Sequence, residues 1–148
     1  MIDQKYATRA ATIADSEQIA RLVSSLGYPT SSSQMQKRLE SILGDQHYAT
    51  LVACDAERIV GFIGTRVGPL YESDDDYGQI MALAIARDHQ RRGVGRMLMH
   101  AAESMLVARG VCVLVVSSGN QRADAHAFYE KNGYAFTGRR YKKTVSSA

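Results

Sequence analysis

The chain has 148 residues, 45% of them hydrophobic, and its 18 basic and 15 acidic side chains give a net charge of +3. This length can bury the core of a single domain without disulfide bonds, and the charge is too mild to indicate a nucleic-acid partner. No apolar run is long enough to cross a bilayer and no secretory signal is recognisable, so we expect a cytoplasmic protein without a membrane partner. Cys54 and Cys112 lie in apolar runs without metal-ligand spacing, which predicts buried, reduced thiols and no metal site.

The first third of the chain predicts a strand followed by two helices. Tyr6–Ala10 can form a short strand. The first helix would end before Gly27 and the second would open at a capping box of Ser33 and Gln36. Apolar residues at helical spacing give each helix a buried face: Ile19, Leu22, Val23 and Leu26 in the first, and Met35, Leu39, Ile42 and Leu43 in the second.

A hairpin and an acidic loop come next. Tyr48–Cys54 is expected to pair with Ile59–Val67 through a turn at residues 55–58. The loop at 68–76 contains Glu72 and three consecutive aspartates, which are more often simply solvated than functional.

The middle of the chain contains a glycine-rich junction between a strand and a helix. Ile80–Ala86 is apolar throughout, which predicts a strand covered on both faces. Gln90–Gly95 then carries two glycines before an amphipathic helix, whose apolar stripe is Val94, Met97, Leu98, Ala101, Met105 and Leu106. Glycines let backbone amides approach a ligand, and a helix N-terminus favours negative charge, so this junction is a candidate phosphate site.

The last third repeats the pattern of strand, loop and helix. Val111–Val116 is apolar and β-branched, Ser117–Asn120 forms a loop, a helical stretch ends with 127–132, and Gly133–Phe136 opens a final strand. The predicted order is β-α-α-β-β-β-α-β-α-β. This order indicates an α/β fold with a mixed sheet and helices on both faces.

These two segments resemble, in order and spacing, motifs A and B of the GNAT family of N-acetyltransferases. Motif A is matched by Gln90–Gly95, and motif B by the strand, Asn120, Phe128-Tyr129 and Gly133-Tyr134. The resemblance is close from residue 77 to 137 and covers the first half in outline. It implies a single acetyltransferase domain over residues 1–148 that uses acetyl-CoA as co-substrate.

The resemblance also implies roles for particular residues. The pyrophosphate of acetyl-CoA would be anchored by the backbone amides of six residues: Arg91, Arg92, Gly93, Val94, Gly95 and Arg96. Main-chain groups of Leu83 and Ile85 would bind the pantetheine arm, and Asn120 would hydrogen-bond CoA, unless it only closes an Asx turn. Tyr129 would act as the general acid that protonates the thiolate, the alternative being an edge residue of the core.

The sequence departs from the family where many members carry a glutamate base on the fourth strand. Here that region holds Gln79, Met81 and Ala82, none of which can accept a proton. The base could instead be an acid of the loop (Glu72, Asp74, Asp75 or Asp76), His126 or water.

The function expected is transfer of an acetyl group from acetyl-CoA to a primary amine, on a small molecule, in a ternary complex. One alternative is a non-catalytic acyl-CoA-binding sensor or regulatory module, because the strand glutamate is missing. A second is a peptide or protein N-acetyltransferase. The chain could form a homodimer.

Overall fold

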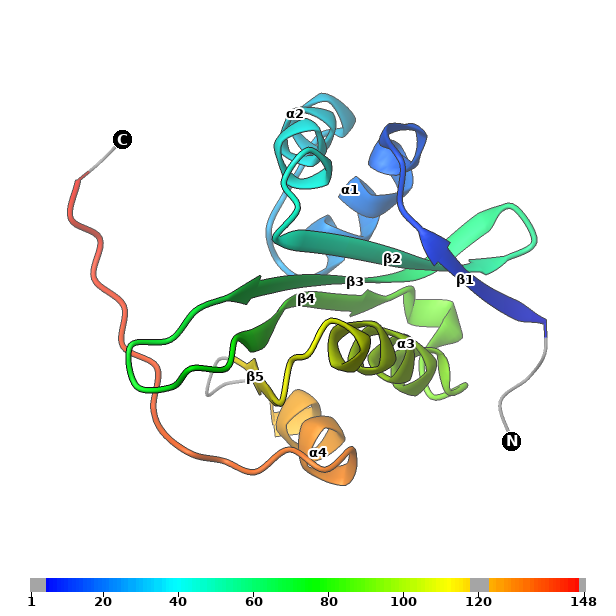
Figure 1. Cartoon of the computed structure of the whole chain (residues 1–148). Coiled ribbons are helices and arrows are strands. Elements are labelled where there is room, and N and C mark those ends of the chain that lie inside the picture. The colour runs from blue at the N-terminus through cyan, green and yellow to red at the C-terminus, as the bar shows by residue number, and fades with distance from the viewer. Residues whose placement is uncertain (1–4, 118–122, 147–148) are drawn as a thin grey trace. The chain divides into compact units, whose positions relative to one another are not determined.

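The computed structural model (Figure 1) describes residues 5–117 and 123–146 of the chain. Contacts divide the chain into two compact units, residues 1–115 and 116–148. In chain order the helices and strands are β1 (Tyr6–Ala10), η1 (Ile13–Asp15), α1 (Ser16–Ser25), α2 (Ser32–Leu43), β2 (Tyr48–Asp55), β3 (Arg58–Gly68), β4 (Tyr77–Ile85), η2 (Arg87–His89), α3 (Val94–Ala108), β5 (Val113–Val116) and α4 (Ala123–Lys131). A single domain over residues 1–148 stays a prediction.

The strands of the described residues form one sheet in the order β1-β2-β3-β4-β5. The first four pair antiparallel with their sequence neighbours, so the predicted hairpin of β2 and β3 is confirmed. In Figure 1, α1 and α2 lie on one face of the sheet and α3 lies on the other. The α/β class, with a sheet covered by helices on both faces, is therefore confirmed.

The face under α1 and α2 buries one part of the core. Ile19 and Leu22 of α1 and Met35 and Leu39 of α2 pack with side chains of the sheet: Val52, Cys54, Ile59, Phe62 and Ala84. The helical spacing of these residues is the reason that the two helices bury one face each.

The other face holds α3 close to the sheet. Val94, Leu98, Ala102 and Leu106 recur every four residues and are fully or almost fully buried. A side chain on Gly61 would place its Cβ 2.9 Å from Ile85 Cδ1. The same Cβ would lie 3.1 Å from Leu98 Cδ1, so the missing side chain lets α3 pack close to β3.

Five sequence-based expectations were wrong. Leu43, predicted on the buried face of the second helix, is 37% exposed at the end of α2. The capping box of α2 is formed by Ser31 and Gln34, two residues earlier than Ser33 and Gln36, because Ser31 has the extended backbone of an N-cap and precedes the first helical residue. Cys112 is exposed, since it lies just before β5. The strand predicted at Ile80–Ala86 is β4 (Tyr77–Ile85), and it is not covered on both faces, because Met81 is 49% exposed.

The fifth correction concerns the end of the chain, where residues 132–146 form no strand. A strand needs a neighbour that accepts its backbone hydrogen bonds and a face that can be buried. The large apolar side chains of this segment are sparse, separated by Gly138 and a basic run, and exposed: Phe136, Tyr141 and Val145.

Among the described residues, no helix combines the length and the apolar character needed to cross a bilayer.

Candidate functional site

The junction between β4 and α3 is built from an unusual backbone. Arg91 has a φ of +62° and Gly93 a φ of +85°, both in the left-handed region. That region is costly for arginine, and such strained residues gather at ligand-binding and active sites. A Cβ built on Gly93 would meet no atom within 4 Å, so the space in front of this backbone is open.

The first turn of α3 lacks the groups that usually satisfy a helix N-terminus. Gly93 is the N-cap and provides no side chain, and no acidic residue lies in the first turn. By contrast, the N-terminus of α2 is closed by the Ser31 hydroxyl, which accepts a hydrogen bond from the Gln34 amide at 3.1 Å. The first amides of α3 are therefore suited to an external anion.

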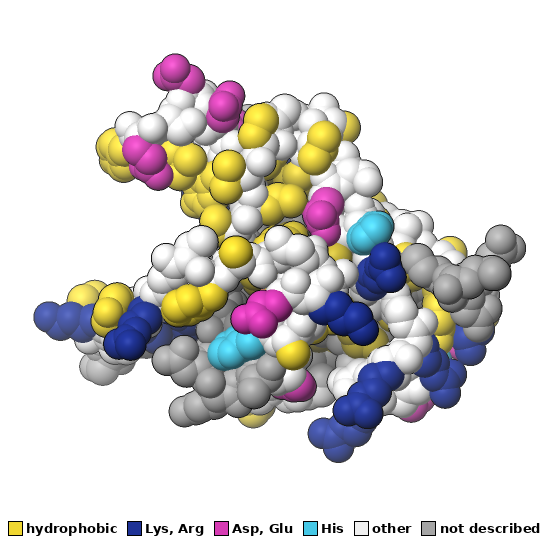
Figure 2. Space-filling model, turned by 90° about the horizontal axis from the view of Figure 1, so that it is seen from below, with side chains coloured by type: hydrophobic (Ala, Val, Ile, Leu, Met, Phe, Trp, Pro, Cys, Tyr) yellow, Lys and Arg dark blue, Asp and Glu magenta, His cyan; other side chains and the backbone are white. Residues whose placement is uncertain are grey.

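Cationic side chains surround this N-terminus. Arg91, Arg92 and Arg96 are all exposed, and Lys and Arg side chains recur over the face of the molecule in Figure 2. Buried Val94 and Leu98 hold the helix in place, so the amides are fixed while the arginines remain in solvent.

The strand that leads into this junction has an irregularity in its middle. Ala82 pairs with Gly64 and Ile80 pairs with Thr65, so Met81 has no partner on β3. Such a bulge leaves backbone groups out of the ladder and turns the strand locally. Leu83 and Ile85 follow in regular pairing with β3 and have half-buried side chains.

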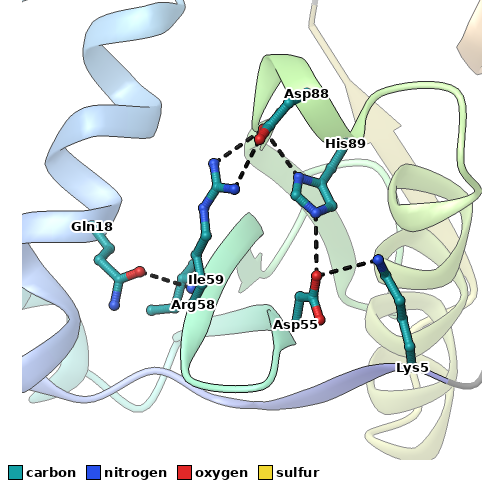
Figure 3. A network of polar contacts seen from close by, with 7 residues as sticks. All are labelled: Lys5, Gln18, Asp55, Arg58, Ile59, Asp88 and His89. Atoms are coloured by element: carbon teal, nitrogen blue, oxygen red, sulfur yellow. Dashed lines mark hydrogen bonds and ion pairs between the residues drawn. The ribbon is translucent and has the colours of Figure 1, made fainter.

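A polar network lies directly before the glycine-rich loop (Figure 3). Asp88 accepts hydrogen bonds from Arg58 Nη1 at 2.8 Å and Nη2 at 3.0 Å. His89 lies with Nδ1 3.0 Å from Asp88 Oδ1 and Nε2 3.4 Å from Asp55 Oδ2. Lys5 Nζ completes the network 3.3 Å from the same Asp55 oxygen.

The network holds its carboxylates ionised. The Arg58 guanidinium, and then His89, keep the pKa of Asp88 well below its usual range. Lys5, and then His89, lower the pKa of Asp55. His89 itself is buried, with its ring edge-on to Tyr6 at 5.9 Å between centroids. These residues were not predicted from the sequence, although Asp88-His89 directly precedes the predicted loop.

The second unit contains the predicted general acid. Tyr129 of α4 is half-buried, and its ring packs edge-on against Phe128 at 5.5 Å and Tyr134 at 6.1 Å. Gly133 has a φ of +93°, which ends the helix and returns the Tyr134 amide to the Tyr129 carbonyl at 3.0 Å. These contacts fix Tyr129 within its own unit. Asn120, which was predicted to bind CoA, lies outside the described residues.

Comparison with known proteins identifies the relationships of this chain. The sequence profile of the acetyltransferase (GNAT) family matches residues 16–134. Mycothiol acetyltransferase of Rhodococcus jostii (strain RHA1) is 32% identical over 88 residues, which cover 59% of this chain and 28% of that protein. The chain spans about a quarter of the length of the curated relatives it matches.

Solved structures share the fold along almost the whole chain. A GNAT family acetyltransferase of Staphylococcus aureus is 26% identical with a TM-score of 0.82, covering 95% of this chain and 98% of that chain. An aminoglycoside N-acetyltransferase in complex with CoA has a TM-score of 0.83 at 15% identity, covering 95% of both chains. The second likeness is evidence for the fold alone.

Proposed function

The chain belongs to the GNAT family of acetyltransferases, and we propose that it transfers an acetyl group from acetyl-CoA to a primary amine of a small molecule. The observation that carries this proposal is the start of α3. There an uncapped helix N-terminus, a left-handed Gly93 and exposed arginines meet at one place.

These features fit the pyrophosphate of acetyl-CoA. The amides of Arg91, Arg92, Gly93, Val94, Gly95 and Arg96 would bind its oxygens, aided by the positive end of the helix dipole. A side chain at Gly93 would project into the open space in front of the loop and hold a phosphate away. Asn120, Leu83 and Ile85 would bind the rest of CoA, as the resemblance to the family implies.

Acetyl-CoA supplies the reactive thioester when bound. The bulge at Met81 supports a role for β4 main-chain groups in polarising its carbonyl, since they lie outside the regular ladder. Tyr129 would donate its phenolic proton to the departing thiolate, whose ordinary pKa of about 8.5 lies close enough to that of tyrosine for such a transfer.

The amine must reach the site neutral or lose a proton to another group. Gln79, Met81 and Ala82 cannot accept one, so the proton would pass to an acid of the loop at 72–76, to His126 or to water. A small acceptor is supported by the similarity to a mycothiol acetyltransferase.

The test is the release of free CoA thiol from acetyl-CoA over a panel of small amines and peptides. Tyr129→Phe removes one hydroxyl and little volume, and we expect it to lower kcat by roughly 10²–10⁴-fold with little change in acetyl-CoA affinity. Tyr141→Phe is the matched control in the same unit, because Tyr141 is 86% exposed. Binding of CoA without thiol release for any acceptor would indicate a non-catalytic module instead. Near-normal turnover in Tyr129→Phe would remove that residue from the mechanism.

A further inference from the structure

The loop that we assign to acetyl-CoA is tied to a distant part of the chain by two consecutive residues. Asp88 and His89 belong to η2, directly before Gln90–Gly93. Their partners, Arg58 and Asp55, are the residues that begin β3 and end β2, on either side of the hairpin turn. Figure 3 shows the side chains from the loop and from the hairpin pointing toward one another.

The backbone of the same segment is attached to the hairpin as well. The Ala86 amide donates to the Val60 carbonyl at 2.7 Å, and the His89 amide donates to the Ala86 carbonyl at 2.8 Å. The Ile59 amide donates in turn to Gln18 Oε1 of α1 at 2.8 Å, which fixes the start of β3. Arg58 therefore projects from a backbone position that is itself held.

His89 joins two carboxylates through one ring. Both ring nitrogens face carboxylate oxygens, at 3.0 Å and 3.4 Å, and carboxylates only accept hydrogen bonds. The ring lies between the two carboxylates, and its edge-on contact with Tyr6 fixes its orientation. His89 thus connects Asp55, at the end of β2, to Asp88, directly before the loop.

The loop requires such an anchor because its backbone is strained. Only residues 90–93 separate His89 from α3, and Arg91 among them has a φ of +62°. A strained conformation persists only where the structure on both sides fixes it. Buried Val94 fixes the helix side, and η2 fixes the strand side.

We propose that Asp88 and His89 are positioning residues, which hold the acetyl-CoA loop in its binding conformation by connecting it to Arg58 and Asp55 of the β2–β3 hairpin. This inference rests on the proposed use of the loop for acetyl-CoA.

The exposure of the Asp88–Arg58 pair separates this role from a role in folding. The two side chains are 60% and 54% exposed. Exposed ion pairs contribute little to the free energy of unfolding, because water and salt screen them. Loss of the pair should therefore change the loop without unfolding the protein.

The experiment measures the Kd of CoA by calorimetry, with KM for acetyl-CoA and kcat beside it once an acceptor is known. We expect Asp88→Asn to raise Kd and KM by up to about fivefold, the most that loss of an exposed pair can shift the loop, while kcat changes less than about twofold. Arg58→Gln breaks the same contact from the hairpin and should have the same effect. The double variant should have the same Kd and KM as either single variant, because all three proteins lose the same interaction.

Glu17→Gln is the matched control, because it breaks an exposed Arg–carboxylate pair on α1 that has no contact with the loop. It should leave Kd, KM and kcat unchanged. Wild-type affinity in both Asp88→Asn and Arg58→Gln would overturn the positioning role, and so would a lower Tm with unchanged CoA affinity. A wild-type protein that binds no CoA would overturn the proposed function and this inference together.

Discussion

Two arginine–aspartate pairs of this protein have the same geometry and different surroundings. Arg9 donates both terminal nitrogens to Asp15 at 2.8 Å, and Arg58 donates both to Asp88 at 2.8 and 3.0 Å. The Asp15 side chain is 7% exposed, whereas that of Asp88 is 60% exposed. Geometry alone therefore does not determine what such a pair does.

The difference follows from what else each carboxylate contacts. Asp15 also accepts a hydrogen bond from the Thr12 amide at 2.8 Å, and so it joins the end of β1 to the start of α1 beside the main core. The Arg9 hydrogen bonds lower the pKa of Asp15 against the effect of burial, which would raise it. Among the described residues, the Asp88 carboxylate has Arg58 and His89 as its hydrogen-bond partners, beside the glycine-rich loop. The first pair should stabilise the fold, and the second should position a binding loop.

The largest effect on stability is expected for Asp15→Asn. This change removes a buried charge from two guanidinium hydrogen bonds and should lower the free energy of unfolding by about 2–3 kcal/mol. Urea denaturation measures this change, and the folded variant should bind CoA as the wild type does. Asp88→Asn should show the opposite result: the midpoint of urea denaturation should be nearly unchanged, and CoA should bind more weakly. An equal loss of stability in the two variants would contradict the different roles that we assign to the two pairs.

Acid should remove the difference between wild type and Asp15→Asn. The folded pKa of Asp15 lies below that of the unfolded chain, so its contribution is complete above the unfolded value of about 3.9 and is lost as the pH falls through the folded value. Urea denaturation at a series of pH values should give a constant difference in stability between pH 5 and 8. The difference should shrink below about pH 4. A difference that persists at the lowest pH would show that the charge of Asp15 is not its source.

Local patterns predicted much of the fold. The apolar spacing of Ile19 and Leu22, and of Leu98 and Leu106, identified the buried faces of α1 and α3, since helical periodicity and burial have one cause. The glycines of residues 90–95 marked the junction where the left-handed Gly93 occurs. The bulge at Met81 had no signal in its own strand, because it arises from the register with β3.

The polar network could not be predicted in this way. Arg58 and Asp88 are 30 residues apart, and Asp55 and His89 are 34 apart, so no periodicity relates them. These residues come together because β4 pairs antiparallel with β3, which places the end of β4 beside the start of β3. The prediction of a final strand was wrong for a related reason. The segment after Gly133 could form a strand only beside a neighbouring strand, and its own sequence does not specify that neighbour.

The smallest effect is expected for a third pair, between Arg21 and Glu17 of α1. Its atoms are as close as those of the other two, at 2.7 Å, yet the side chains are 73% and 66% exposed. Pairs of this spacing on a helix surface contribute about 0.3–0.5 kcal/mol, so Arg21→Ala should lower the free energy of unfolding by no more than that. Urea denaturation at low and high salt is the measurement, and the difference should decrease as salt screens the charges. CoA affinity should stay at the wild-type value, because no contact leads from this pair to the loop. A loss as large as that of Asp15→Asn would mean that short distance, rather than burial and further contacts, determines the contribution of an arginine–carboxylate pair in this fold.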